Sequence, residues 1–528
     1  MRPVVLSGFM GTGKSTLGPA LAARLGVPFV DTDAEIERRS GRSVPDLWRE
    51  EGEAAFRQRE AELADRLLGQ QGGVVVAFGG GTVTVDRVRR LAADRALVVT
   101  LMAAPEAVVA RTPNLAARPN LAVGDPIARA RELMDHRAAA YAECHLSLRT
   151  DTLSPEGALD AIVALVGRDP LLMPLGARSY PLDVCIDEPA RLTDAVARCA
   201  PSSVVMVTDS NVQRARGAAI DAALRPLQTP TTRVALPAGE THKTLASVST
   251  IWDAALGAGV DRDAVVVATG GGVVGDLAGF AAACLLRGVR FVQVPTTLLA
   301  MVDSSVGGKT GFDHPTGKNL VGAFHQPSAV VADLHHLTTL APRELKSGLA
   351  EVAKIALATD AALLDRVEAA AGELAGGNHG ALLPVVRAAI EAKIRIVRDD
   401  ERESGPRALL NLGHTLGHAL EAQGGYSRWL HGEAVAMGTV AEMQATASLG
   451  WTPRDLVHRA VAALAALGLP TRVDPTELAA AWHFVSSDKK RAREHTRDVL
   501  RLPVVTGPGR SAIYTIALGD LRAAALGS

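Results

Sequence analysis

A glycine-rich loop near the start of the chain has the composition of a phosphate-binding loop. Residues 8–15 read GFMGTGKS and fit G-x-x-x-x-G-K-[ST], between an apolar run at 4–6 and a helix-like stretch at 16–25. Glycine lets successive backbone N–H groups turn toward phosphate oxygens, and the helix N-terminus adds a favourable dipole. We therefore predict a nucleotide site, with Lys14 on the outer phosphates and Ser15 on Mg²⁺, built from Gly11, Gly13, Lys14, Ser15 and Thr16.

Three further clusters could hold the molecule that accepts the phosphoryl group. Asp31 and Asp33 end the second expected strand, at the carboxyl edge where parallel sheets bind ligands. Arg57 and Glu60 are three positions apart and would share one face of a helix. The glycines at 79–81 follow the third strand, where missing side chains let a small ligand approach the backbone.

A second glycine-rich loop lies in the middle of the chain. Residues 270–276 read GGGVVGD, follow an apolar run and open a helix-like segment, as a loop that binds a dinucleotide pyrophosphate does. Alone, such a loop also fits close packing of a helix on a strand. Polar residues near the ends of neighbouring strands favour the dinucleotide, and they are Asp209, Asn211, Glu240, Lys243, Thr296 and Thr297.

Candidate metal ligands stand in the final third of the chain. His414 and His418 are four positions apart and would lie on one face of a helix. His431 and Glu433 follow after a short loop, and Glu351 lies on an earlier helix. Two histidines and one glutamate are a common divalent-metal set that leaves positions for substrate oxygens. Core histidines would explain the His414–His418 spacing alone, whereas the complete set predicts a metal centre.

Cationic groups are dense around the same segments. A substrate with both a phosphate and a carboxylate would need such a set, because arginine and lysine pair with both groups. The residues of this set and their polar neighbours are Arg287, Asp303, Lys309, Lys318, Asn319, Lys354, Lys393, Arg407, Lys489 and Lys490.

Composition restricts the class of protein. The chain has 528 residues, 48% of them hydrophobic, and 56 basic against 57 acidic residues. We expect several domains with sizeable cores and no general attraction to nucleic acid or membranes. The four cysteines form no C-x-x-C pair, which fits a reducing cytoplasm. The longest apolar region, 264–286, contains Asp276 and many glycines, so we predict a buried strand, loop and helix there, not a membrane span.

The elements that would position these groups alternate between strands and helices. Apolar runs at 4–6, 28–30, 74–78 and 97–101, and again at 204–208, 234–236, 264–269 and 290–295, predict two α/β domains with parallel sheets. Residues 345–423 and 432–469 have a period of about 3.6 and predict a mostly helical final third. The expected domains are 1–167, 180–337 and 338–528, with a linker at 168–179.

Over roughly residues 1–165, the order and spacing of the phosphate loop and the three clusters, with Arg137-x-x-x-Tyr141, resemble shikimate kinase. The resemblance implies a P-loop kinase fold, ATP as donor, and Asp31 beside Ser15 at Mg²⁺. It also implies that shikimate is held by Asp33, Arg57, Gly80 and Arg137, and that Arg118 closes over the phosphates on a lid. The lid departs from the family's usual sequence at Pro113 and Asn120, so turnover is a separate question from binding.

From about residue 180 to the end, nearly every motif resembles 3-dehydroquinate synthase in order. The resemblance implies a Rossmann-like domain and a helical metal-binding domain, with NAD⁺ and Zn²⁺ or Co²⁺. Glu351, His414 and His431 would bind the metal, and His418 would handle protons and contact phosphate. The implied NAD⁺ site is Asp209, Asn211, Glu240, Lys243, Gly271, Gly272, Val273, Asp276, Thr296, Thr297, Lys318 and Asn319. The implied site for 3-deoxy-arabino-heptulosonate 7-phosphate is Arg287, Asp303, Lys309, Lys318, Asn319, Lys354, Lys393, Arg407, Asn411, His418 and one of Lys489 and Lys490.

Among these residues, the implied catalytic groups are Lys14 and Arg118 in the kinase half, and Arg287, Lys309, Lys354 and His418 in the synthase half. The resemblances predict a bifunctional cytoplasmic enzyme that phosphorylates shikimate and converts the heptulosonate phosphate to 3-dehydroquinate. One alternative is an active synthase whose kinase-like domain only binds a nucleotide or has a structural role. Another makes the larger half a related sugar-phosphate cyclase or a metal-dependent polyol dehydrogenase. The expected partners are small molecules, and the synthase half could form a homodimer.

Overall fold

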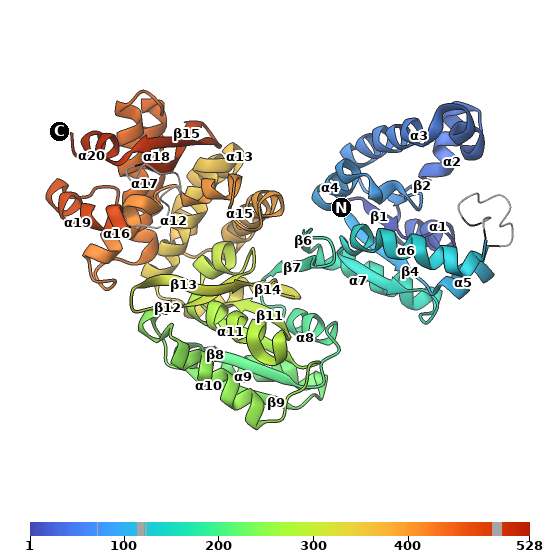
Figure 1. Ribbon diagram of the computed structural model, residues 1–528, viewed down its shortest axis with the longest axis horizontal. Helices are drawn as coiled ribbons and strands as arrows, with labels where there is room; N and C mark the ends of the chain where they lie inside the picture. The colour runs from blue at the N-terminus through green and yellow to red at the C-terminus, as the bar shows by residue number, and fades with distance from the viewer. Residues whose placement is uncertain (71, 113–120, 122–123, 488–498, 528) are drawn as a thin grey trace. The chain divides into compact units, whose positions relative to one another are not determined.

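The computed structural model describes residues 1–70, 72–112, 121, 124–487 and 499–527. The chain divides into two compact units, Met1–Asp183 and Val184–Ser528 (Figure 1). Among the described residues, none of the helices is both long enough and apolar enough to cross a bilayer.

The first unit alternates strands with helices. Its elements are β1 (Val4–Ser7), α1 (Lys14–Leu25), β2 (Phe29–Asp31), α2 (Thr32–Ser40), α3 (Val44–Gly69), β3 (Val75–Ala77), α4 (Asp86–Arg95), β4 (Leu97–Met102), α5 (Pro105–Ala110), α6 (Pro126–Ala142), β5 (Leu146–Arg149), α7 (Pro155–Arg168) and β6 (Leu171–Met173), and β7 (Tyr180–Cys185) crosses into the second unit.

A five-stranded parallel sheet, in the order β2-β3-β1-β4-β5, is the centre of the first unit. Successive side chains of β1 point to opposite faces, and both faces are apolar because helices cover each of them. Val4 and Leu6 pack against α1 and α7, whereas Val5 packs in a second core with α3 and α4. The segment expected as a linker contains β6, which pairs antiparallel with β7.

The second unit begins with another α/β region. Its elements are α8 (Ala190–Ala197), β8 (Val204–Asp209), α9 (Ser210–Leu224), β9 (Thr231–Leu236), α10 (Leu245–Gly257), β10 (Val265–Gly270), α11 (Gly272–Cys284), β11 (Arg290–Pro295), β12 (Lys309–His314), β13 (Gly317–Phe324) and β14 (Ala329–Asp333). Strands β14, β11, β10, β8 and β9 are neighbours in that order and run parallel. Helices α10 and α11 cover one face, and α8 and α9 cover the other.

The rest of the second unit is mostly helical, as Figure 1 shows in yellow to red. Its elements are α12 (Pro342–Thr359), α13 (Ala361–Ala369), α14 (Ala371–Ala375), α15 (His379–Asp399), α16 (His414–Gln423), α17 (His431–Ser448), α18 (Arg454–Ala466), α19 (Pro475–Ser487), β15 (Val499–Gly507), β16 (Arg510–Ala517) and α20 (Leu518–Leu526). The α/β class with a helical final part is therefore confirmed.

The apolar runs that we expected as strands are all strands, β1 to β4 and β8 to β11. The hairpin β15–β16 was not predicted in the helical part. Its signal is short, because Leu500 and Leu502 are buried on either side of exposed Arg501 but Pro503, Val504 and Val505 are all buried. This period of two is characteristic of a half-buried strand, but it lasts for only a few residues.

Helices α12, α16 and α17 approach one another at glycines. A Cβ atom on Gly432 of α17 would lie 1.9 Å from the backbone oxygen of Ser347 in α12. A Cβ on Gly438 would lie 2.2 Å from the backbone oxygen of Gly413, the residue before α16. These helices therefore pack backbone against backbone, which brings their side chains to one place.

A buried carboxylate holds the first turn of α16. Glu442 of α17 is 1% exposed and accepts hydrogen bonds from the backbone N–H groups of Gly413 at 2.8 Å and Leu416 at 3.0 Å. No side chain of α16 caps this helix, so α17 supplies the acceptor for two of its free N–H groups. The contact fixes His414, the first residue of α16, relative to α17.

We expect Gly438→Ala to destabilise the second unit by about 1–3 kcal/mol, because the new Cβ would overlap backbone atoms that cannot rotate away. Gly257→Ala is the matched control, since nothing lies within 4 Å of a Cβ at this last residue of α10. Denaturant unfolding of the full chain, followed by tryptophan fluorescence, measures both. Equal stability of the two variants would contradict the backbone-to-backbone packing.

Candidate active sites

The phosphate loop connects β1 to α1. Gly8, Gly11 and Gly13 have φ angles of 130°, 73° and 97°, which glycine adopts without strain. Gly13 precedes α1, and no side chain caps the helix, so its first N–H groups are available to a ligand. Lys14 Nζ donates to the backbone oxygens of Gly8 and Phe9, each at 2.8 Å. Backbone donors and an ammonium group at one loop fit the phosphates of a nucleoside triphosphate.

Ser15 and Asp31 meet beside this loop. Ser15 Oγ donates to Asp31 Oδ2 at 3.1 Å. The other oxygen of Asp31 caps α2, because it accepts from the N–H groups of Asp33 at 3.1 Å and Ala34 at 3.3 Å. A hydroxyl and a fixed carboxylate oxygen side by side are ligands that Mg²⁺ prefers, so the pair fits a hydrated magnesium ion.

The predicted acceptor residues meet at the turn formed by Gly79, Gly80 and Gly81. Arg137 Nη1 donates to the backbone oxygen of Gly80 at 3.0 Å, and the Tyr141 hydroxyl donates to the same oxygen at 2.5 Å. A Cβ on Gly79 would lie 2.6 Å from Asp33 Oδ1, and a Cβ on Gly81 would lie 2.2 Å from Arg57 Nη2. A side chain at Gly79 or Gly81 would therefore displace the Asp33 carboxylate or the Arg57 guanidinium from its present position.

The acceptor turn also touches the phosphate loop. A Cβ on Gly80 would lie 3.4 Å from the backbone nitrogen of Met10, and the Arg137 guanidinium carbon lies 5.6 Å from the centre of the Phe9 ring. The nucleotide loop and the acceptor residues thus form one continuous site, as transfer of a phosphoryl group requires.

Glu60 orients Arg57. Arg57 Nη1 donates to Glu60 Oε2 at 2.6 Å, and its guanidinium carbon lies 5.4 Å from the centre of the Trp48 ring. Glu60 is fully buried, and its other oxygen accepts from the Thr82 hydroxyl. A stacked and paired guanidinium keeps its planar fork in one direction, which suits recognition of a carboxylate.

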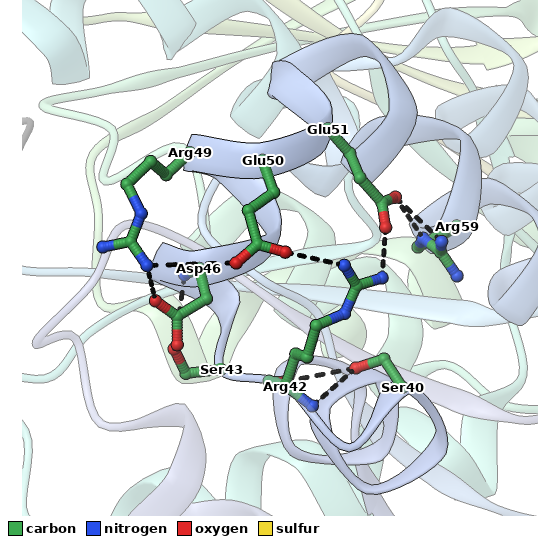
Figure 2. A network of polar contacts seen from close by, with 8 residues as sticks. All are labelled: Ser40, Arg42, Ser43, Asp46, Arg49, Glu50, Glu51 and Arg59. Carbon is green, nitrogen blue, oxygen red and sulfur yellow. Dashed lines mark hydrogen bonds and ion pairs between the residues drawn. The ribbon is translucent and has the colours of Figure 1, made fainter.

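An ion-pair network supports the helix that carries Arg57 (Figure 2). Arg42 contacts Glu51 and, at 2.9 Å, Glu50 Oε2, and Arg59 Nη2 lies 2.8 Å from Glu51 Oε2. Gly52 interrupts the helical geometry of α3 with φ 85°. The Glu51–Arg59 pair therefore joins the two halves of a bent helix. Exposed pairs contribute only about 0–1 kcal/mol each, so we attribute orientation more than stability to this network.

The second glycine loop joins β10 to α11. A Cβ on Gly271 would lie 3.2 Å from Thr297 Cγ2, and a Cβ on Gly272 would lie 3.2 Å from Ser304 Oγ. Helix α11 starts at Gly272 without a side-chain cap, so the first-turn N–H groups, that of Val273 included, face this loop. The glycines and free N–H groups fit a pyrophosphate. Asp209 ends β8, the strand next to β10, so its carboxylate and Asn211 lie at the same sheet edge.

Lys243 joins several of the predicted dinucleotide residues. Its Nζ lies 2.7 Å from Asp276 Oδ2 and 2.6 Å from Asn319 Oδ1. Burial opposes the charge of Lys243, but the carboxylates of Asp276 and Glu240 raise the pKa of the ammonium above its ordinary value. Lys318 Nζ lies 3.3 Å from Glu240 Oε1. Thr296 is also buried, and its N–H donates to Gly270 at 2.9 Å.

The candidate metal centre lies where α12, α16 and α17 meet. Glu351 Oε1 is 3.4 Å from His431 Nε2 and 3.8 Å from His414 Nε2. Glu351 is fully buried, and neither carboxylate oxygen has a well-directed hydrogen bond, although Lys354 Nζ contacts Oε2. Tetrahedral ligands about 2.0–2.2 Å from a zinc ion are separated by about 3.3–3.6 Å, so the three side chains fit a divalent metal.

Each histidine of this centre is oriented by a second contact. His414 Nδ1 is 3.2 Å from the Leu412 backbone oxygen, and His431 Nδ1 is 3.1 Å from Glu421 Oε2, so both Nε2 atoms face Glu351. Burial lowers the pKa of His431, but Glu351 and Glu421 outweigh it and raise the pKa to about 10. A bound metal would replace the proton that these carboxylates hold on the ring. His418 is exposed, and its ring centre lies 5.0 Å from that of His414.

An ion pair between buried Lys393 and partly exposed Asp303 adjoins the metal centre. Lys393 Nζ contacts Asp303 Oδ1 and the Asp303 backbone oxygen, each at 2.5 Å. Burial raises the pKa of Asp303, but the charges of Lys393 and Lys354 lower it below its ordinary value. Burial lowers the pKa of Lys393 to about 8, with Arg407 acting in the same direction and Asp303 against it. Four charged groups thus lie within mutual electrostatic reach.

Glu403 connects two more predicted substrate residues. It contacts Lys309 Nζ, and its Oε1 accepts from Asn411 Nδ2 at 2.7 Å. Glu403 has a backbone φ of 59°, which residues other than glycine, asparagine and aspartate seldom adopt. Arg407, nearby in sequence, donates to the Gly307 backbone oxygen from both Nη atoms at 3.3 Å.

Some predicted site residues have no described contact with the clusters above. Arg287 is exposed with φ 70°, and among the described residues no contact joins it to the metal centre or to Asp303. Arg118, with Pro113 and Asn120 of the lid, and Lys489 and Lys490 lie outside the described residues. The roles assigned to all of these residues stay predictions.

Three glutamates were missed from the sequence. Glu421 orients His431, Glu403 holds Lys309 and Asn411, and Glu442 caps the helix of His414. Glu421 is three positions after His418, so helical spacing could have indicated it. The other two act through turns and helix packing, for which the sequence has no comparable spacing signal.

Fold and site geometry together define a phosphate-loop kinase domain followed by a nucleotide-binding α/β domain with a helical metal domain. Comparison with protein families gives the same domains. Residues 10–166 match the shikimate kinase family, residues 233–347 the N-terminal domain of 3-dehydroquinate synthase, and residues 348–491 its C-terminal domain. The chain therefore belongs to both families, as a fusion of a shikimate kinase with a 3-dehydroquinate synthase, and combines a kinase with a lyase.

Solved structures show similar folds. A 2-deoxy-scyllo-inosose synthase complexed with carbaglucose-6-phosphate, NAD⁺ and Co²⁺ is 24% identical with a TM-score of 0.61, covering 68% of this chain and 99% of its own. A 2-epi-5-epi-valiolone synthase from Streptomyces hygroscopicus subsp. jinggangensis 5008, with NAD⁺ and Zn²⁺ bound, is 28% identical with a TM-score of 0.59, covering 66% and 96%. Shikimate kinase from Acinetobacter baumannii, in complex with shikimate, is 34% identical over 32% of this chain and 94% of its own, with a TM-score of 0.31.

We expect Glu421→Gln to weaken zinc binding by about 10–100-fold, because an amide orients His431 less strongly than a carboxylate does. Competition with a chromophoric chelator measures the affinity. Glu391→Gln on α15 removes a half-exposed carboxylate that pairs with Arg387, and it should leave zinc binding unchanged. Equal affinities would mean that Glu421 does not act on the metal.

Lys393 should make stability depend on pH. Its pKa is about 8 in the folded chain, below the ordinary value of 10.5, so the unfolded chain binds more protons between these values. The free energy of unfolding should therefore rise with pH from about 8 to about 10.5 relative to Lys393→Arg, whose guanidinium stays charged. Urea unfolding of both proteins across this range tests the sign, and parallel curves would contradict the lowered pKa.

Proposed function

We propose that the chain catalyses two reactions. The first is ATP-dependent phosphorylation of shikimate to shikimate 3-phosphate. The second converts 3-deoxy-D-arabino-heptulosonate 7-phosphate to 3-dehydroquinate with release of phosphate. The kinase proposal rests mainly on the contact between the phosphate loop and the acceptor turn. The synthase proposal rests mainly on the metal ligands and the cationic groups beside them.

In the kinase site, the chain's residues position two reactants and balance charge. Arg57 and Arg137 would hold the shikimate carboxylate, and Asp33 would accept hydrogen bonds from its hydroxyl groups. Lys14 would draw charge from the outer phosphates of ATP, while Ser15 and Asp31 would hold Mg²⁺. The backbone oxygen of Gly80 already accepts hydrogen bonds from Arg137 and Tyr141, and these bonds hold the turn in place. Phosphoryl transfer needs this positioning more than it needs covalent chemistry.

In the synthase site, Glu351, His414 and His431 would hold the metal, and the α11 N-terminus with Asp209, Glu240 and Lys243 would hold the dinucleotide. When bound, the metal lowers the pKa of substrate hydroxyls, and NAD⁺ removes and later returns a hydride, so no net oxidation results. The cationic groups of the chain hold the two ends of the substrate while its middle reacts. They are Lys309, Lys354, Lys393 and Arg407. His418, exposed beside the metal ligands, is placed to move a proton and to contact the leaving phosphate.

Charge supports the proposal of heptulosonate over other sugar phosphates. The similar solved structures include cyclases with other products, and one holds carbaglucose-6-phosphate. A substrate with a carboxylate as well as a phosphate uses more cations, and Lys393 and Arg407 are both buried near Asp303. A heptulose 7-phosphate without the carboxylate would make fewer contacts with these cations.

A paired assay tests both proposals on the purified full chain. It measures phosphate release from the heptulosonate phosphate with NAD⁺ and Zn²⁺, and ADP formation from ATP, Mg²⁺ and shikimate. Lys14→Met should reduce ADP formation by at least about a hundredfold and leave phosphate release unchanged, because a cation on the transferred phosphate is lost. His414→Ala should reduce phosphate release and leave ADP formation unchanged.

The outcomes separate the alternatives. Phosphate release without ADP formation would make the first unit a nucleotide-binding or structural module. Equal turnover of a heptulose 7-phosphate that lacks the carboxylate would assign the second unit to a related cyclase. No phosphate release from either substrate would contradict the synthase proposal.

A further inference from the structure

A cavity of about 460 Å³ in the second unit shares no residue with the sites described above. It lies between α8, α9, the ends of β11 and β14, and the short helix η7 (Leu334–Thr339) that follows β14. Its size is typical of sites for small molecules. Much of its lining is apolar and includes Leu192, Ile220 and Val331, while Arg216 and His336 supply nitrogen atoms.

Two nitrogen atoms of this cavity lack partners. Arg216 Nε and His336 Nδ1 are both buried, and neither forms a hydrogen bond within the described part of the chain. His336 is 8% exposed, so its ring has little access to solvent. Buried polar atoms are nearly always paired in folded proteins, and a ligand that accepts hydrogen bonds would pair these two.

Two of the three carboxylates that line the cavity are already engaged, and the third, Asp187, is exposed with an oxygen 3.9 Å from His335 Nε2. Asp333 accepts from the backbone N–H groups of Asp187, His335 and Glu188 at 2.8, 2.9 and 3.1 Å, and Glu188 pairs with Arg191 at 2.8 Å. Arg216 has no ion pair among the described residues. Burial lowers the pKa of His336 to about 4, against the effect of Asp333, so this ring is neutral near pH 7. Arg216 is therefore the arginine of the lining with which a ligand carboxylate could pair.

We propose that this cavity binds a small molecule with one carboxylate on an apolar body. The carboxylate pairs with Arg216 and the His336 ring, and the apolar body packs on Leu192, Ile220 and Val331. A sugar phosphate fits less well, because its hydroxyl groups would meet apolar side chains without partners.

Titration calorimetry of the full chain tests the proposal with 3-phenylpropionate as the probe. We expect measurable binding below about 10 mM, and binding at least tenfold weaker for 3-phenylpropionamide, which lacks the charge, and for acetate, which lacks the apolar body. No heat from 3-phenylpropionate up to that concentration would overturn the proposal.

Two variants locate the binding. Arg216→Gln should weaken it at least tenfold, whereas Arg214→Gln, an exposed arginine of the same helix, should not. Ala219→Phe fills the cavity from an exposed position and should abolish binding, whereas Ala218→Phe outside the lining should not. Unchanged turnover in both catalytic reactions checks that the variants fold. Binding that survives Arg216→Gln or Ala219→Phe would place the probe elsewhere and refute the proposal.

Discussion

Three helix backbones that touch at glycines determine where the metal ligands of the second unit can lie. The contacts at Gly432 and Gly438 leave no space for a Cβ, so α12, α16 and α17 have one relative position. Glu351, His414 and His431 come from these three helices, and both histidines stand at helix starts. A shift of one helix by an ångström would separate ligands that a metal must bind together. Glu442 reinforces the arrangement, because it satisfies the first turn of α16 from α17.

The same principle of fixed backbones applies to the first unit. Gly8, Gly11 and Gly13 of the phosphate loop have positive φ angles that favour glycine, and a Cβ on Gly79 or Gly81 of the acceptor turn would displace Asp33 or Arg57. Arginines supply the chemistry around them, and each is held by a partner, as Arg57 is by Glu60 and Arg137 by the Gly80 oxygen. Rigid backbone and oriented cations together keep the reorganisation needed for phosphoryl transfer small.

The sequence was sufficient for the eight strands that carry or adjoin the two glycine loops and for many of the residues that meet at each site. Long apolar runs and glycine loops have strong local signals, so β1, β10 and the loops after them could be predicted. Glu442 and Glu403 could not, because their roles depend on which helix faces which and on a single backbone conformation at Glu403. Arg287 is a residue whose predicted role has no contact among the described residues to support it, and that role stays a prediction. A resemblance assigned it to the substrate, but its exposed position joins it to none of the described site residues.

The division of the chain near residue 183 has a consequence for dosage. Every described residue of the candidate kinase site lies before this division, and every described residue of the candidate synthase site lies after it. The described residues of each site therefore come from one continuous stretch of polypeptide. Translation of one message makes the two catalysts in a fixed ratio of one to one, whatever their turnover numbers. Any adjustment of one flux against the other must then come from substrate concentrations or from changes in kcat or KM, and not from expression.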